Sequence, residues 1–120
     1  MRRIVFAVIG VVFLAGSSAL AHHSYAGFVQ DQVVSIEGDV EAFHFVNPHV
    51  ILKVRTQDAR VYTAALRSST QLGRDGMTST SLKVGDRVVI SGSPSRDAAE
   101  LVLTLIREVR RPADGWHWTR

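Results

Sequence analysis

The segment VVSIEGDVEAFHF, residues 33–45, decides the expected fold because apolar and polar side chains alternate along it. Residues two apart lie on the same face of a β-strand, so one face of this segment is expected to be buried and the other, which carries acidic side chains, exposed. Gly38 falls on the apolar side and is expected to mark a bulge or a bend. The segment is therefore predicted to be the first strand of a mainly all-β domain.

A hairpin and a short helix are expected next. Residues 49–56 (HVILKVRT) and 60–66 (RVYTAAL) alternate in the same way and are separated by a short turn, which predicts an antiparallel pair of strands. The hydroxyl side chains of residues 68–70 can cap a helix that ends near Gly73 or Gly76, because such a side chain satisfies the free amides of the first turn.

The last two predicted strands are residues 87–92 (RVVISG) and 99–110 (AELVLTLIREVR). The composition of the second segment also partly suits a helix, but its leucines recur at every second position and turn residues precede it, which favours a strand. The expected order is three strands, a short helix and two strands. This is the order of the OB-fold, a five-stranded, partly open barrel with its helix between strands three and four. A simple β-sandwich is the alternative.

The first 21 residues have the pattern of a secretory signal peptide. Arg2 and Arg3 supply the positive charge, residues 4–14 (IVFAVIGVVFL) are apolar, and residues 19–21 (ALA) match an A-x-A cleavage site. The apolar run is shorter than the about 20 residues that a membrane-spanning helix needs. We therefore expect cleavage after residue 21, export to the periplasm or the cell exterior, and no membrane span afterwards.

Removal of the signal peptide would leave about 99 residues and one domain. The expected organisation is an N-terminal arm at 22–32, an OB-like barrel at 33–110 and a C-terminal tail at 111–120. The chain contains no cysteine, so packing alone must hold the domain together. Twelve basic and eleven acidic residues would remain, a net charge of about +1, which argues against nucleic-acid binding. No catalytic motif is recognised, so an enzyme is not expected.

Several motifs occur together over nearly the whole chain after the signal peptide. They are AHHS at 21–24, GDV at 38–40, FVNPH at 45–49, LGRDG at 72–76, LKVGDRV at 82–88 and SGSPSRD at 91–97. In combination they resemble the DUF6152 family, small exported bacterial proteins of unknown function, and the resemblance implies no activity. The chain departs from the family pattern at Phe45 and Met77, where the family has Trp, and at 62–65, where a Trp-x-x-Glu pattern lacks its carboxylate.

The expected new N-terminus carries the sharpest chemical hypothesis. Cleavage would place an α-amine on His22, next to His23, and the amine and ring Nδ1 of one histidine can chelate a metal together. A third nitrogen would complete a T-shaped site that suits Cu(II). His49, directly after Pro48, is the best candidate for that ligand, while His23 could instead bind through its own ring. The alternative is that these histidines are solvated or structural.

A second hypothesis requires no metal. The exported barrel would then bind a protein or a small ligand through its aromatic side chains. The candidate contact residues are Tyr25, Phe43, Phe45, Tyr62 and Trp116. Trp116 and Trp118 can also be interpreted as side chains that pack over one end of the barrel.

Overall fold

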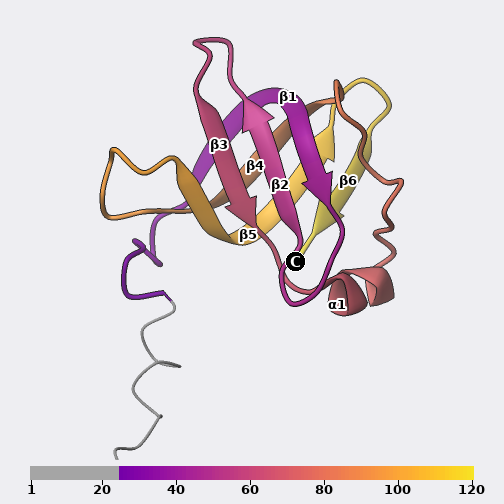
Figure 1. The fold of residues 1–120 in the computed structure, drawn as a ribbon, viewed down its shortest axis with the longest axis horizontal. Coiled ribbons are helices and arrows are strands. Elements are labelled where there is room, and N and C mark those ends of the chain that lie inside the picture. The colour runs from indigo at the N-terminus through magenta and orange to yellow at the C-terminus, as the bar shows by residue number, and fades with distance from the viewer. Residues whose placement is uncertain (1–24) are drawn as a thin grey trace, which may run out of the picture.

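The computed structural model describes residues 25–120, so the predicted signal peptide and the two adjacent histidines lie outside the described residues. Within the described part, the chain forms six strands and one short helix (Figure 1). In chain order they are β1 (Val34–His44), β2 (Ile51–Arg55), β3 (Val61–Ala65), α1 (Ser69–Arg74), β4 (Arg87–Pro94), β5 (Val102–Arg111) and β6 (Trp116–Thr119).

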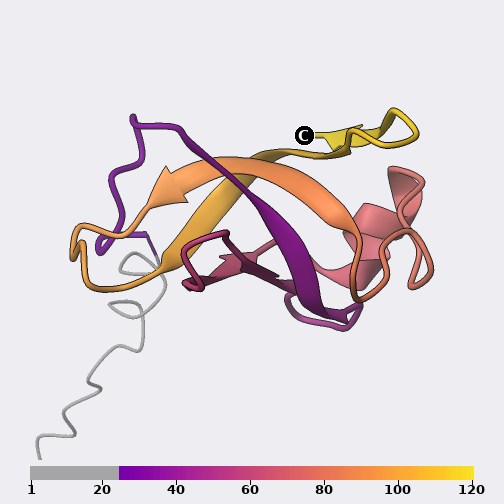
Figure 2. The same cartoon turned by 90° about the horizontal axis from the view of Figure 1, so that it is seen from above.

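The first five strands close into a barrel. Their order in the sheet is β3-β2-β1-β4-β5, with antiparallel neighbours, and β5 returns to pair in parallel with β3. This order and the helix between β3 and β4 confirm the OB-like fold and exclude the sandwich. The view from above shows β4 and β5 crossing over β2 and β3, with α1 at one end of the barrel (Figure 2).

Alternating side chains fill the barrel interior, as the period of two predicted. Val40 of β1, Leu52 of β2 and Ile90 of β4 are each at most 2% exposed. Leu72 of the short helix is also fully buried. It is the one buried side chain of α1, and it packs into the core at the end of the barrel. Ser68 is the N-cap of α1 and accepts a hydrogen bond from the backbone N–H of Gln71, which confirms the predicted cap. Among residues 25–120, no helix has the length and apolar character needed to cross a bilayer.

The first strand carries a bulge, but not at the position predicted for it. The register of β1 on β2 shifts between Val40 and Ala42, which makes Glu41 the extra residue. Gly38 has a different role, since a Cβ at this position would overlap the backbone carbonyl of Arg55 on β2. The missing side chain therefore lets the two backbones approach closely.

The strand β5 has a larger irregularity where it changes partner. Ser91 of β4 is paired with Glu108, but Ser93 is paired with Thr104, so three residues of β5 lie opposite Gly92 alone. One of them, Leu105, has φ 47°, a left-handed conformation that is unusual for a bulky side chain. A bulge of this kind bends its strand, and here the strand leaves β3 after a short pairing.

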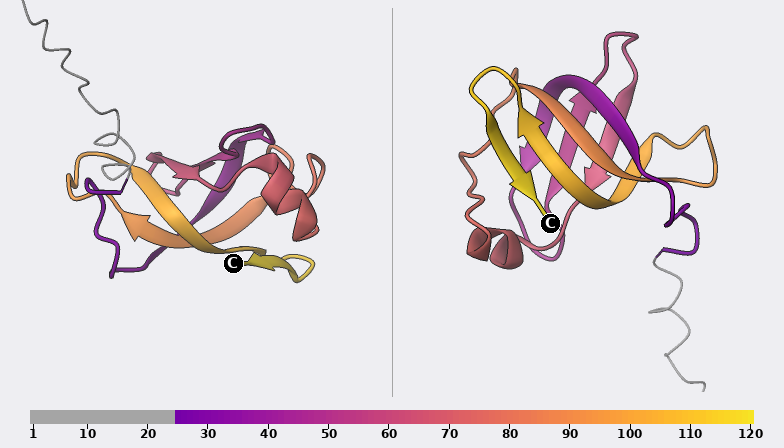
Figure 3. Two further views of the ribbon diagram at one scale, coloured as in Figure 1. Left: turned by 90° about the horizontal axis from the view of Figure 1, so that it is seen from below. Right: turned by 180° about the vertical axis from the view of Figure 1, so that it is seen from behind.

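The C-terminal segment, which the sequence indicated only as a tail, contains the strand β6. It lies beside the second half of β5, at the outer edge of the barrel (Figure 3). Trp118 pairs with Val109 and is 5% exposed. Arg111 stabilises the turn before β6 by donating hydrogen bonds to Asp114, and its guanidinium lies 5.4 Å from the ring centre of Trp116.

Candidate functional site

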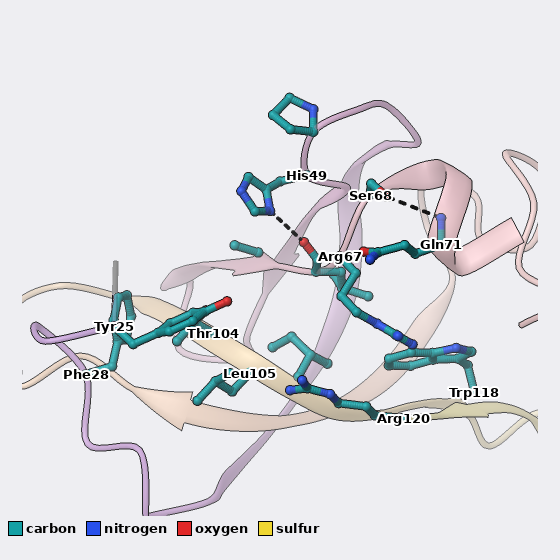
Figure 4. A pocket seen from close by; sticks show the side chains of 14 residues that line it. Tyr25, Phe28, His49, Arg67, Ser68, Gln71, Thr104, Leu105, Trp118 and Arg120 are labelled. Carbon is teal, nitrogen blue, oxygen red and sulfur yellow. Dashed lines mark hydrogen bonds between the residues drawn. The ribbon is translucent and has the colours of Figure 1, made fainter. Parts of the chain in front are cut away.

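A cavity of about 470 Å³ lies at the seam where the barrel closes. β3 and β5 pair through only two residue pairs, Thr63 with Val102 and Ala64 with Leu103, and the two segments then separate. Residues 65–68 line one side of the cavity and residues 104–106 the other. The cavity therefore results from the bend in β5, and Figure 4 shows the side chains that surround it.

His49 lies at the rim of this cavity, in the loop between β1 and β2 (Figure 4). Its Nδ1 is 3.1 Å from the backbone carbonyl oxygen of Leu66. A carbonyl oxygen can only accept, so this contact assigns the ring hydrogen to Nδ1 and leaves the lone pair of the neutral ring on Nε2. Histidines that bind metals are commonly oriented by such a bond to a backbone carbonyl.

Asn47 fixes the loop that carries His49. Its Oδ1 accepts hydrogen bonds from the Ser69 hydroxyl at 2.8 Å and from the Thr70 backbone N–H at 3.2 Å. These bonds join the loop to the first turn of α1. The Asn47–Pro48 peptide bond within the loop is cis. The Asn-Pro-His motif therefore holds a histidine against the end of β3.

The N-terminal arm is attached to the end of β4 and to the chain that follows it, and this attachment brings its aromatic residues to the cavity. The backbone N–H of Val29 donates to the Pro94 carbonyl at 2.9 Å. Arg96 binds the arm twice, since its backbone N–H donates to Gly27 at 2.7 Å and its Nε donates to Ala26 at 3.0 Å. Tyr25 and Phe28, which belong to the same stretch of the arm, line one end of the cavity (Figure 4).

Two arginines and a tryptophan line the other parts of the cavity wall. The guanidinium of Arg67 lies 5.8 Å from the ring centre of Trp118, and its terminal nitrogen forms an ion pair with Asp75, which is not a lining residue. Arg120 also lines the cavity, and no carboxylate of residues 25–120 lies within 4.0 Å of its guanidinium. These two side chains make this part of the wall basic.

Of the predicted aromatic contact residues, the structure brings Tyr25 to the cavity and places the others elsewhere on the barrel. Phe43 and Phe45 form a tilted pair with ring centres 5.9 Å apart, and Tyr62 lies under Arg60. These three and Trp116 are half-buried against the core. Phe28, Arg67 and Arg120 also line the cavity and were missed, since nothing in the sequence distinguishes them from other aromatic and basic residues. Trp118, which the sequence grouped with Trp116, lines it as well.

The predicted metal ligands are divided between two parts of the chain. His22 and His23 lie outside the described residues, whereas His49 is described and exposed. Within residues 25–120, no three His, Cys, Asp or Glu side chains are grouped as a metal site. His44 and His117 are both exposed, and neither lines the cavity.

Comparison with known proteins finds one family. The model of DUF6152, described as a family of unknown function, matches residues 10–103. No curated protein matches the chain. No solved structure matches it either.

Proposed function

The chain belongs to the DUF6152 family, whose function is unknown, and from the geometry of its cavity we propose that it is an exported copper-binding protein. Cu(II) would be held by the α-amine and ring of His22, with the ring of His49 as a further ligand and His23 beside them. The observation that carries the proposal is that the N-terminal arm and His49 meet at one cavity, because Tyr25 and His49 both line it.

The first described residue of the arm, Tyr25, lines the same cavity as His49. The α-amine of His22 would lie three residues before Tyr25, a distance of at most about 10 Å along an extended chain. Because Arg96 binds the carbonyls of Ala26 and Gly27, the arm is attached just after this point. The chelate that we propose at His22 would therefore be tethered to an attached arm whose Tyr25 lines the same cavity as His49.

The state of the His49 ring supports the proposal chemically. The bond from Nδ1 to Leu66 leaves Nε2 as the nitrogen that can bind a metal. Imidazole and amine nitrogens are ligands that Cu(II) prefers. An α-amine has an ordinary pKa of about 8, so a metal can displace its proton near neutral pH.

The experiment is a Cu(II) titration of the chain that begins at His22, followed by calorimetry with a competing chelator and by electron paramagnetic resonance. Three variants accompany it: one that retains Ala21 before His22, His49→Gln, and the control His44→Gln, which alters an exposed histidine outside the cavity. We expect the first two changes to weaken binding by about tenfold or more and the control to bind as the unmodified chain does. Equal affinity in all four proteins would contradict the proposal.

A further inference from the structure

The volume and the lining of the cavity also suit a small organic molecule, which the copper proposal does not involve. Its volume, about 470 Å³, is within the range of about 300–1,000 Å³ that is typical of small-molecule sites. Phe28, Leu105 and Ile106 supply an apolar wall, while Tyr25, Ser68 and Gln71 supply polar groups. A molecule that fits this space would therefore need an apolar body and a polar end.

The charge of the cavity wall indicates which polar group the ligand would carry. Fourteen residues line the cavity, and none of them is Asp or Glu. Arg67 and Arg120 both contribute guanidinium groups, and Asp75, the ion-pair partner of Arg67, lies outside the lining. A guanidinium favours carboxylate-like acceptors because its planar donors match their oxygens. The wall therefore favours an anionic group over a neutral or cationic one.

Unsatisfied hydrogen-bond donors are concentrated at the same place. Among the half-buried and buried residues of the described chain, two buried side-chain nitrogens lack a hydrogen-bond partner, Nε of Arg67 and Nε1 of Trp118. Both residues line the cavity. Buried polar groups normally have partners, so each exception calls for an explanation. The Arg67 side chain is 36% exposed, so it is partly open to solvent beside its ion pair with Asp75.

The backbone of the wall is also unusual. Leu105 is held at φ 47° within the β5 bulge, and its side chain lines the cavity. Strained backbone conformations in folded proteins concentrate at binding and catalytic sites. In Figure 4, Tyr25 and Phe28 lie at one end, and Arg67 and Trp118 lie at the other, with Leu105 and Arg120 between them. The apolar and basic parts of the wall are thus arranged along one cavity.

We infer that this cavity binds a small organic monocarboxylate, with the carboxylate at Arg67 and Arg120 and the apolar body against Phe28 and Leu105. This site goes beyond the proposed copper site, because it requires no metal. It also differs from the metal-independent hypothesis based on the sequence, since of those aromatic residues it uses only Tyr25.

The test uses the chain that begins at His22, freed of metal with a chelator, and the probe 3-phenylpropionate. Binding is measured by calorimetry and by the NMR signals of the two indole N–H groups. We expect the probe to bind and to shift the signal of Trp118 more than that of Trp116. The uncharged analogue 3-phenylpropanamide should bind at least tenfold more weakly.

Variants connect the binding to the two arginines. Arg67→Gln and Arg120→Gln should each weaken the binding of 3-phenylpropionate at least tenfold. The control Arg107→Gln changes an exposed arginine of β5 outside the cavity and should leave this binding unchanged. Arg120 is exposed, so Arg120→Gln remains informative if Arg67→Gln fails to fold. Failure of the acid to bind, equal binding of acid and amide, or binding unaffected by Arg120→Gln would overturn the inference. Because the protein is metal-free, none of these results depends on the copper proposal.

Discussion

At the scale of single residues, Gly92 makes the β5 bulge possible. A Cβ at this position would lie 2.7 Å from Cδ1 of Ile106 and 2.8 Å from the carbonyl oxygen of Thr104. The carbonyl belongs to the backbone and cannot move without distorting the bulge. We expect Gly92→Ala to lower the free energy of unfolding by about 2 kcal/mol, the usual cost of overpacking a tight interior. Urea denaturation measures this change.

The matched control for this prediction is Gly73→Ala. Gly73 lies within α1, and no atom lies within 4 Å of the place its Cβ would occupy. Alanine favours the helix over glycine by about 1 kcal/mol, so this variant should be slightly more stable than the unmodified chain. If Gly92→Ala and Gly73→Ala had the same stability, steric contact would not explain why position 92 requires glycine.

Asn47 illustrates a residue whose role depends on a distant part of the chain. The hydrogen-bond partners of its side chain come from α1, more than twenty residues later. We expect Asn47→Ala to lower the free energy of unfolding by about 1 kcal/mol, since it removes bonds to the Ser69 hydroxyl and the Thr70 amide. Asn47→Asp keeps the accepting oxygen and should recover most of the loss, as thermal denaturation can show. No difference between Ala and Asp would contradict this role.

At the scale of elements, the first five strands and the helix were predictable because each carries a local pattern. The alternation in β1 and the hydroxyl cap at Ser68 depend on residues next to one another in the chain. The strand β6 was not predictable in this way. It has four residues, and its place depends on pairing with β5 and on Arg111, whose partners include Asp86 from a distant turn.

The arm at 25–30 is an element without regular structure, and Arg96 is its main attachment. We expect Arg96→Ala to increase hydrogen exchange of the Val29 amide by about tenfold, because local opening governs exchange in weakly packed segments. The Val29 amide reports on the arm since it donates to Pro94. Global unfolding in urea should stay unchanged. The control Arg107→Ala, an exposed residue outside the arm contacts, should leave the Val29 exchange rate as it is.

The attachment of β6 should depend on pH. Hydrogen bonding to Arg111, followed by the Trp116 backbone N–H, lowers the pKa of Asp114 below its ordinary value of 3.8. The folded chain then binds fewer protons here than the unfolded chain, so this stabilisation is complete above pH 3.8 and is lost as the pH falls through the lower folded value.

We expect protection of the Arg120 amide, which donates to Arg107, to fall over this acidic range. The measurement is the hydrogen-exchange rate of this amide, divided at each pH by the intrinsic exchange rate of an unprotected amide. Asp114→Asn removes the titrating group, so in this variant the Arg120 amide should show low protection at every pH of the range. If the variant retained the same acid-dependent loss as the unmodified chain, Asp114 would not be its origin.

At the scale of the whole molecule, the barrel could be predicted but its cavity could not. Strand order follows from patterns along the chain, whereas the cavity exists because β5 leaves β3 after two residue pairs. That separation depends on the β5 bulge, in which three residues lie opposite Gly92. Because Gly92 and the bulge are in different strands, no local pattern predicts it. His49 could be chosen because a motif carries it. Arg67 and Arg120 could not, since only the closed barrel brings them to the same wall.

The two proposed sites share this wall, which leads to a prediction about the whole protein. His49 would hold a metal cation at the rim of the cavity whose basic wall would hold a carboxylate. A carboxylate favours a nearby cation electrostatically, so each ligand should tighten the other. Thermodynamic linkage requires the two enhancements to be equal, and a coupling of about 1 kcal/mol would make each about fivefold.

Calorimetry can measure both sides of this coupling. Cu(II) is titrated with and without saturating 3-phenylpropionate, and the acid is titrated with and without bound copper. The amide analogue should leave copper affinity unchanged because it carries no charge. Arg120→Gln should abolish the enhancement while leaving copper affinity in the absence of acid intact, since Arg120 is not a metal ligand. Copper affinity that does not respond to the acid would show that the two sites do not act on one another across the cavity.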